Sequence, residues 1–151
     1  IGPLQSNKTR LVAEHVDWMH SVERLKIAER LSQQRPAPLA PLNICLQVNV
    51  SGEATKSGCT LEEAPALAAK IATLPNIRLR GLMCIPEPAD DFEAQRQPFR
   101  LLRELYDNLR VQGLSLDTLS MGMSHDMEAA IAEGATIVRV GTAIFGDRNK
   151  Q

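Results

Sequence analysis

The chain has 151 residues, of which 44% are hydrophobic and 23% charged, a composition ordinary for one soluble globular domain. Its 17 basic and 18 acidic residues give a net charge of -1 without any basic block, which excludes the electrostatic footprint of a nucleic-acid or membrane-surface binding protein. The printed residues contain no apolar run of membrane length, and we expect a cytoplasmic protein with no nucleic-acid partner and no membrane partner.

The first half of the sequence alternates predicted helices and strands. Ile44, Leu46 and Val48 recur at every second position, as in a strand, and Thr60 and Glu63 have the spacing of a capping box at the start of a helix. The proline-rich stretch 36–41 is interpreted as a rigid loop. The predicted elements are a helix at 6–15, a strand at 16–22, a helix at 21–34, a strand at 43–50 and a helix at 60–74.

The three cysteines fall between residues 45 and 84. Cys45, Cys59 and Cys84 are odd in number and form no C-x-x-C pair, which argues against a disulfide framework and against a zinc site. We expect them to be reduced and half-buried, and no metal is expected.

The second half continues the alternation. Pro86 ends a strand, Pro98 is taken as a first-turn residue of an amphipathic helix, and Gly113 and Gly134 end helices. The predicted elements are a strand at 79–86, a helix at 99–113, a strand at 118–121, a short helix at 125–134 and a strand at 136–146.

Strands separated by helices require parallel crossovers, which leaves an open doubly wound sheet or a closed β/α barrel. No G-x-G-x-x-G follows any predicted strand, which weakens the dinucleotide-binding form of the open sheet. Barrels often hold a phosphate with the loops after their last two strands and the amino end of a short helix. The end of this chain has those parts in order, so the sequence favours the barrel.

The stretch SMGMSHDMEAAI is interpreted as half of an anion site. Ser120 ends a predicted strand, Gly122 allows a tight turn, and Ser124 is placed to cap the short helix, whose amino end favours a phosphate. On the next strand Gly141 permits close backbone approach and Thr142 adds a hydroxyl. A capped helix and a glycine that eases packing would explain the same residues without a ligand.

Arg139 is the one charge in a run that is otherwise apolar. It shares strand parity with Ile137 and Gly141, so it should face the same side as the glycine. An isolated charge there would cost several kcal/mol, and we therefore expect Arg139 to have a partner. That partner is either a barrel carboxylate or a ligand ring or carboxylate beside the phosphate, unless the side chain extends outward to solvent.

With these residues in view, the chain resembles the YggS-type pyridoxal phosphate homeostasis protein family, also called proline synthetase co-transcribed homologues. The resemblance covers nearly the whole chain and rests on IGPLQSNK, QVNVSGEATKSG, RGLMCIP, SMGMSHDMEAAI and VRVGTAIFG in that order. It implies a (β/α)8 TIM barrel of the alanine racemase N-terminal type. Residues 1–151 would be a single domain, the carboxyl-terminal portion of that barrel, without about the first three strand-helix units.

The resemblance also implies site residues for pyridoxal 5'-phosphate. Ser120, Gly141 and Thr142 would hold the cofactor phosphate, and Arg139 would face the pyridine nitrogen. The lysine that forms the Schiff base is expected upstream of Ile1, so no catalytic residue is assigned in this chain, and Lys8 and Lys56 are expected to be solvated surface lysines. The further candidates for lining the site are Asn49, Met83, Gly122, Met123 and Ser124.

Three functions are compatible with these observations. The first is a cofactor-binding protein for intracellular homeostasis or delivery of pyridoxal phosphate, without catalytic turnover, monomeric at full length, with apo pyridoxal phosphate enzymes as partners. The second is an amino-acid racemase-like enzyme, which would need a second base that the sequence does not reveal. The third is a phosphosugar-processing barrel enzyme, which would use the phosphate site but leaves the family motifs unexplained.

Overall fold

The computed structural model describes residues 2–52 and 57–145. Its strands form one five-stranded sheet in the order β1-β2-β3-β4-β5, with every neighbouring pair parallel. The elements in chain order are η1 (Ser6–Lys8), α1 (Thr9–His15), β1 (Trp18–Val22), α2 (Leu25–Gln34), β2 (Leu42–Gln47), α3 (Ala64–Ala72), β3 (Ile77–Met83), α4 (Phe92–Val111), β4 (Thr118–Met123), α5 (Met127–Ala132), β5 (Ile137–Arg139) and α6 (Thr142–Phe145).

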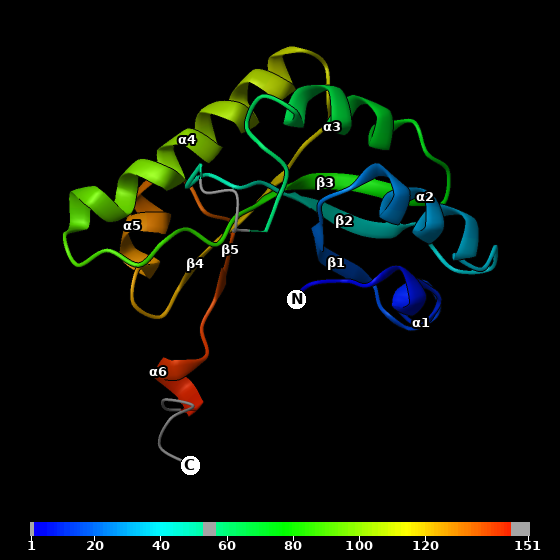
Figure 1. Ribbon diagram of the computed structural model, residues 1–151, viewed down its shortest axis with the longest axis horizontal. Helices are drawn as coiled ribbons and strands as arrows, with labels where there is room; N and C mark the ends of the chain where they lie inside the picture. Colours follow the sequence, from blue (N-terminus) through cyan, green and yellow to red (C-terminus); the bar gives the residue numbers. More distant parts are fainter. Residues whose placement is uncertain (1, 53–56, 146–151) are drawn as a thin grey trace.

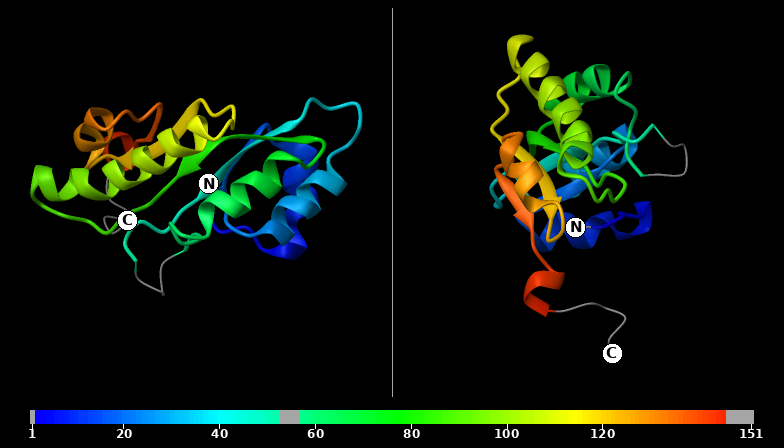
Figure 2. Two further views of the ribbon diagram at one scale, coloured as in Figure 1. Left: turned by 90° about the horizontal axis from the view of Figure 1, so that it is seen from above. Right: turned by 90° about the vertical axis from the view of Figure 1, so that its left-hand side faces the viewer.

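The sheet is part of a β/α barrel. Its strands follow one another in sequence order without the reversal of a doubly wound sheet, and α2, α3 and α4 lie along the outer side of the curved sheet (Figure 1). Two further views show the same helices over one side of the strands, while α6 projects away from the body (Figure 2). The barrel prediction is therefore confirmed.

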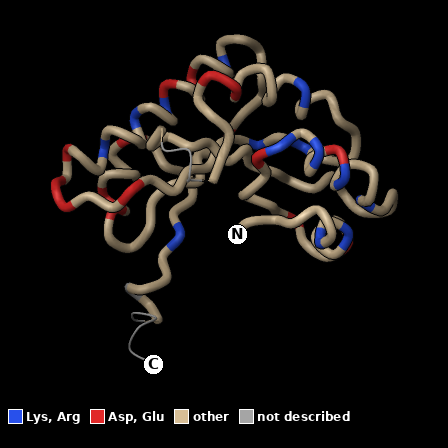
Figure 3. Tube along the Cα trace, viewed as in Figure 1, with Lys and Arg blue, Asp and Glu red and all other residues tan. Residues whose placement is uncertain are grey.

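The hydrophobic core lies between the sheet and its outer helices. Ile44 and Leu82 of the strands and Leu31, Ile71 and Phe99 of the helices are all fully buried there. Acidic and basic positions are interspersed along the outer helices (Figure 3). The opposite side of the sheet, which we call the inner face, carries the side chains of Trp18, His20, Arg80, Ser120 and Arg139, which contact one another in series.

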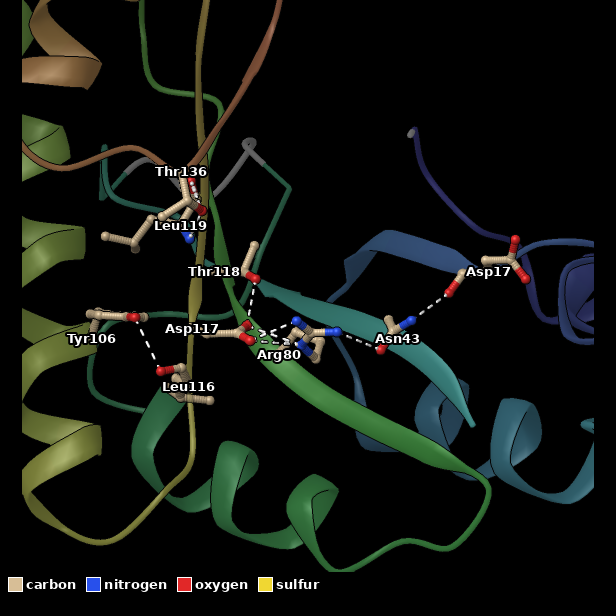
Figure 4. A network of polar contacts seen from close by, with 9 residues as sticks. All are labelled: Asp17, Asn43, Arg80, Tyr106, Leu116, Asp117, Thr118, Leu119 and Thr136. Carbon is tan, nitrogen blue, oxygen red and sulfur yellow. Dashed lines mark hydrogen bonds and ion pairs between the residues drawn. The ribbon is translucent and has the colours of Figure 1, made fainter. Parts of the chain in front are cut away.

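At the amino ends of the strands, the inner face holds a closed polar network (Figure 4). The Arg80 guanidinium donates to both carboxylate oxygens of Asp117, with the shortest N–O distance 2.6 Å, and to Asn43 Oδ1 at 3.0 Å. It also lies over the Trp18 ring, 4.8 Å from its centroid. Asp117 accepts a further hydrogen bond from the Thr118 hydroxyl, and the charges of Arg80 and Asp117 are paired with each other.

Three predicted strands end earlier than expected, and the one predicted at 79–86 runs from Ile77 to Met83. The strand predicted at 43–50 ends at Gln47, after which Val48 makes only an isolated bridge to Cys59. The strand predicted at 136–146 ends at Arg139, because the Gly141 carbonyl accepts from the amides of Ile144 and Phe145 and so starts the helical turn of α6.

The position predicted for Pro98 is wrong. Helix α4 begins at Phe92 rather than at residue 99, because Asp91 caps it by accepting from the Ala94 amide at 3.0 Å. Pro98 lies inside this helix, where it removes a backbone donor. The fully buried side chains of Phe99 and Leu102 hold the helix to the core beyond that position.

The capping box before α3 is confirmed. The Thr60 hydroxyl accepts from the Glu63 amide at 3.0 Å, and a Glu63 carboxylate oxygen accepts from the Thr60 amide at 3.1 Å. These bonds hold the pKa of Glu63 below its ordinary value. The regular helix then starts at Ala64.

The cysteines are more deeply buried than predicted. Cys45, Cys59 and Cys84 are free thiols at or below 5% exposure, and burial raises the pKa of each to about 12. They are therefore unreactive thiols at neutral pH. Within residues 2–52 and 57–145, no group of side chains is arranged to hold a metal ion, and no helix has the length and apolar character needed to cross a membrane.

Candidate functional site

A pocket of about 710 Å³ opens on the inner face near the carboxyl ends of β4 and β5. This volume is within the ~300–1,000 Å³ typical of small-molecule sites. Its walls are mostly apolar, with the Arg139 guanidinium and the His20 imidazole as the ionisable groups. The lining residues are Trp18, His20, Ile85, Met123 and the segment 137–141.

Arg139 is a partly buried cation with neutral hydrogen-bond partners in the part of the chain that the structure describes. Its Nη1 donates to Ser120 Oγ at 2.7 Å, and its Nη2 donates to the Cys84 carbonyl at 2.8 Å. Over the described ranges no carboxylate lies within ion-pair distance of it. Burial lowers the pKa of the guanidinium below its ordinary value. The expectation of a partner is confirmed, but the partners within the protein are neutral oxygens.

Ser120 connects Arg139 to a residue that the sequence did not single out. The Ser120 side chain is completely buried, and its Oγ lies 2.8 Å from Nδ1 of His20, which is 100 residues away in the sequence. Burial, followed by the nearby Arg139 charge, lowers the pKa of His20. The Ser120 hydroxyl thus already has two hydrogen-bond partners within the protein.

Met83 and Met123 lie beside these residues. Met83 pairs in register with Ser120 and is completely buried, facing a smaller pocket of about 170 Å³ that also includes Gln47 and Ile85. Met123 pairs in register with Arg139, is 39% exposed and lines the main pocket. The structure therefore brings Ser120, Met123 and Arg139 together.

Gly122 serves the turn and the packing of α5. It has a φ of +103°, and a Cβ at this position would lie 2.6 Å from the Ala130 Cβ and 3.3 Å from Cγ1 of Val138. Both observations require glycine. Gly122 is not among the residues that line the pocket, so its observed contacts agree with the packing interpretation.

The prediction that Ser124 caps the short helix is wrong. Helix α5 begins at Met127, and its N-cap position is held by Asp126, whose carboxylate accepts from the Met123 amide at 2.7 Å. Asp126 is only 6% exposed. A carboxylate here already complements the positive end of the helix, which weakens the expected attraction of a phosphate to this end. Ser124 lies in the turn before it, partly buried.

Gly141 and Thr142 follow β5 and are exposed. A Cβ at Gly141 would meet nothing within 4 Å, so the expected close backbone approach is not made by the protein's own atoms. Gly141 shares the main pocket with Met123, and the loops after β4 and β5 therefore converge, as predicted. Thr142 is the first residue of α6.

Asn49 and Lys8 are not among the residues that line this pocket. Asn49 holds the loop after β2, where its Oδ1 accepts from the amides of Ser51 and Gly52 at 3.1 and 3.2 Å. Lys8 is an exposed residue of η1, as expected. Lys56 lies outside the described residues.

Sequence reasoning missed His20 and the Cys84 carbonyl. His20 has no metal-like spacing to a carboxylate or another histidine that would mark it as a ligand. A usable signal was strand parity, since Trp18 and His20 share one face of the predicted strand at 16–22. The bond from Arg139 to the Cys84 backbone has no sequence signal, because any residue offers a carbonyl there.

Comparisons with known proteins agree with this geometry. The profile of the family "Alanine racemase, N-terminal domain" matches residues 1–149. The pyridoxal phosphate homeostasis proteins of Pseudomonas aeruginosa and of Escherichia coli K12 are 66% and 56% identical over 149 residues, which is 99% of this chain. The chain spans 64% of the length of each of these relatives.

Solved structures of similar fold include a relative of the same family and an alanine racemase. PipY of Synechococcus elongatus, determined with PLP bound, is 36% identical with a TM-score of 0.86, covering 97% of this chain and 68% of PipY. An alanine racemase of Clostridium difficile in complex with cycloserine is 18% identical with a TM-score of 0.75, covering 97% of this chain and 40% of the racemase. The latter likeness concerns the fold alone.

Proposed function

The chain belongs to the alanine racemase N-terminal domain family, and within it to the YggS-type pyridoxal phosphate homeostasis proteins; from this membership we propose that its inner-face pocket binds pyridoxal 5'-phosphate. Residues 1–151 would act as one domain, the carboxyl-terminal portion of a cofactor-binding barrel. The protein would buffer or deliver the cofactor in the cytoplasm, as a monomer, to apo enzymes that use it.

The observation that carries this proposal is the state of Arg139. A partly buried guanidinium normally has a carboxylate to offset its desolvation, whereas Arg139 has a hydroxyl and a carbonyl and lines an otherwise apolar pocket. An aromatic ring with an acceptor nitrogen and an anionic phosphate fits this combination. The apolar walls from Trp18, Ile85 and Met123 suit the ring, and Arg139 suits its nitrogen.

We propose that Gly141 and Thr142 contribute to the phosphate site. Both are exposed where the loops after β4 and β5 converge, and the open space at Gly141 leaves room for a ligand beside the backbone. Met123, the last residue of β4, borders the same pocket as Gly141, and we propose that Ser124, the next residue along the chain, contributes as well. Ser120 is buried behind Arg139 and supports the site, since its hydroxyl accepts a hydrogen bond from the guanidinium. Met83 lies next to it in the sheet, while Asn49 and Gly122 support the surrounding loops.

Arg139 also bears on turnover. When bound, pyridoxal phosphate acts as an electron sink whose strength depends on the groups near its ring nitrogen. A guanidinium offers only donors and a positive charge, so it opposes protonation of that nitrogen and weakens the sink. This arrangement favours a protein that holds the cofactor with slow or no turnover. A racemase-like enzyme would use the same barrel and the same arginine together with a second base, and it stays the second candidate.

The test compares two proteins. One is this 151-residue chain, and the other, the extended protein, carries the upstream third of the Pseudomonas aeruginosa relative joined before Ile1. Both are titrated with pyridoxal phosphate by absorbance and fluorescence, reduced with borohydride and digested to map the labelled lysine. The extended protein should bind one equivalent through an upstream lysine, and the short chain should bind more weakly without stoichiometric labelling.

Two results would contradict the proposal. Absence of binding by the extended protein would reject the cofactor assignment, and rapid racemisation or transamination of free amino acids would favour the enzyme. An extended protein with Arg139→Met serves as the matched variant, because it tests whether binding depends on this pocket.

A further inference from the structure

The geometry points to His20 as a positioning residue for Arg139, acting through the hydroxyl of Ser120. These three side chains come from β1, β4 and β5, and so connect strands that are not all neighbours in the sheet. The inference rests on the proposed function, because it concerns how the guanidinium is held toward the cofactor.

The donors and acceptors available on each side chain set the direction of this chain of hydrogen bonds. Arginine has no acceptor, so Nη1 of Arg139 must donate to Ser120 Oγ at 2.7 Å. A hydroxyl carries one proton of its own, and the group 2.8 Å away on the other side is Nδ1 of His20. Neutral imidazole with a bare Nδ1 accepts that proton. The polarity then runs from Arg139 to Ser120 to His20.

The surroundings keep His20 in this form. Its side chain is only 8% exposed, and the nearest positive group through the hydroxyl is Arg139. A protonated His20 would bring a second cation to the same hydroxyl and leave the Ser120 proton without this acceptor. The neutral ring must carry its proton on Nε2. The centroids of the Trp18 and His20 rings are 5.9 Å apart, in a tilted contact.

The consequence concerns the guanidinium. Without His20 the Ser120 hydroxyl would be free to rotate toward other acceptors. The lone pair of Ser120 Oγ that accepts from Nη1 of Arg139 would then no longer be held in a fixed direction. With His20 in place, Arg139 is held by one side-chain acceptor on β4 and one backbone acceptor after β3. Two of its five donors are thereby used by the protein, which fixes how the others face the pocket.

The role predicts a specific set of variants of the extended protein. His20→Phe keeps a ring of similar size but removes the acceptor, and should weaken pyridoxal phosphate binding about tenfold. His20→Asn places an amide oxygen near the position of Nδ1, and should restore affinity to within about threefold of the parent. His15→Phe is the matched control, because His15 is 68% exposed on α1, and it should bind as the parent does.

A double-mutant cycle tests whether the effect passes through Ser120. If it does, adding His20→Phe to Ser120→Ala should cause no loss beyond that of Ser120→Ala alone. Full additivity of the two losses would show that His20 acts by another route and would overturn the inference. Equal binding by the parent and His20→Phe would overturn it as well, whereas a parent that does not bind at all would reject the proposed function instead.

Nitrogen NMR of the histidines gives a readout that needs no cofactor. In the extended protein at neutral pH, Nδ1 of His20 should be the unprotonated nitrogen, and Ser120→Ala should shift its signal while leaving His15 unchanged. This measurement applies even if His20→Phe fails to fold. A proton on Nδ1 of His20 in the parent protein would reverse the polarity of the hydrogen bonds and contradict the assignment.

Discussion

Two arginines on the inner face of the sheet have opposite surroundings. Arg80, toward the amino ends of the strands, binds the Asp117 carboxylate and Asn43 (Figure 4) and lies over the Trp18 ring. Its bond to Asp117 raises the pKa of its guanidinium. Arg139, at the carboxyl end of β5, has neutral oxygens as its partners among the described residues, and burial lowers its pKa.

The difference separates a residue that stabilises the fold from one that is available to a ligand. In β/α barrels the amino-end face serves stability and the carboxyl-end face carries the active or binding site. Arg80 has its charge neutralised within the protein, so it has little left to offer a ligand. Arg139 is held in place by two neutral oxygens, so its burial costs stability and its remaining donors are available to an acceptor that enters the pocket.

The largest expected effect is on the free energy of unfolding, and it comes from Gly81, which follows Arg80 in β3. A Cβ at Gly81 would lie 1.7 Å from the backbone oxygen of Thr118, so Gly81→Ala should separate β3 from β4 and lower the free energy of unfolding by about 3 kcal/mol. Gly141→Ala is the matched control, because nothing lies within 4 Å of a Cβ there. Urea unfolding of the extended protein measures both. A smaller loss for Gly81→Ala than for Gly141→Ala would contradict the packing described.

The next effect is an opposite response of binding and stability when each of the two arginines is replaced. Arg139→Met should weaken pyridoxal phosphate binding about tenfold or more and leave the free energy of unfolding unchanged or higher, since it removes a desolvated cation. Arg80→Met should do the opposite, leaving the dissociation constant unchanged and lowering the free energy of unfolding by about 1 kcal/mol, because its partner Asp117 is half exposed. If both variants lost binding equally, the division between the two ends would be wrong.

The smallest effect is a difference in pH dependence. The pKa of Asp117 is held down by Arg80, so its contribution to stability is present above the unfolded value of about 3.9 and is lost as the pH falls below it. The pKa of His20 is lowered by burial, so the unfolded chain takes up its proton first and stability falls as the pH drops below about 6.5. The two groups therefore act in separate pH ranges.

Unfolding measured across pH distinguishes these ranges in the extended protein. His20→Phe should flatten the dependence just below about pH 6.5, and Asp117→Asn should flatten it only near and below about pH 4. A flattening in the same range for both variants would mean that one of the two assignments is incorrect.

The barrel and the importance of Arg139 could be predicted from the sequence because both leave local signals. Alternating apolar residues indicated the strand at 43–50, and the other strands were predicted as short stretches between helices and breaker residues. Arg139 was indicated because it is a charge in an otherwise apolar strand. The failures come from contacts with no local signal. Asp91 was a stronger helix start than Pro98, and Asp126 replaced Ser124 at the cap of α5. The partners of Arg139 come from β4 and the end of β3, and His20 of β1 reaches it through Ser120; only the folded sheet brings these positions together.

The most direct test of the Arg139 assignment observes the cofactor itself. Pyridoxal phosphate labelled with ¹⁵N in its ring is bound to the extended protein, and its nitrogen chemical shift reports whether that atom carries a proton. We predict an unprotonated, hydrogen-bonded nitrogen near neutral pH, which becomes protonated in Arg139→Glu and is unchanged in Arg80→Met. A fully protonated ring nitrogen in the unaltered protein would show that Arg139 does not face it.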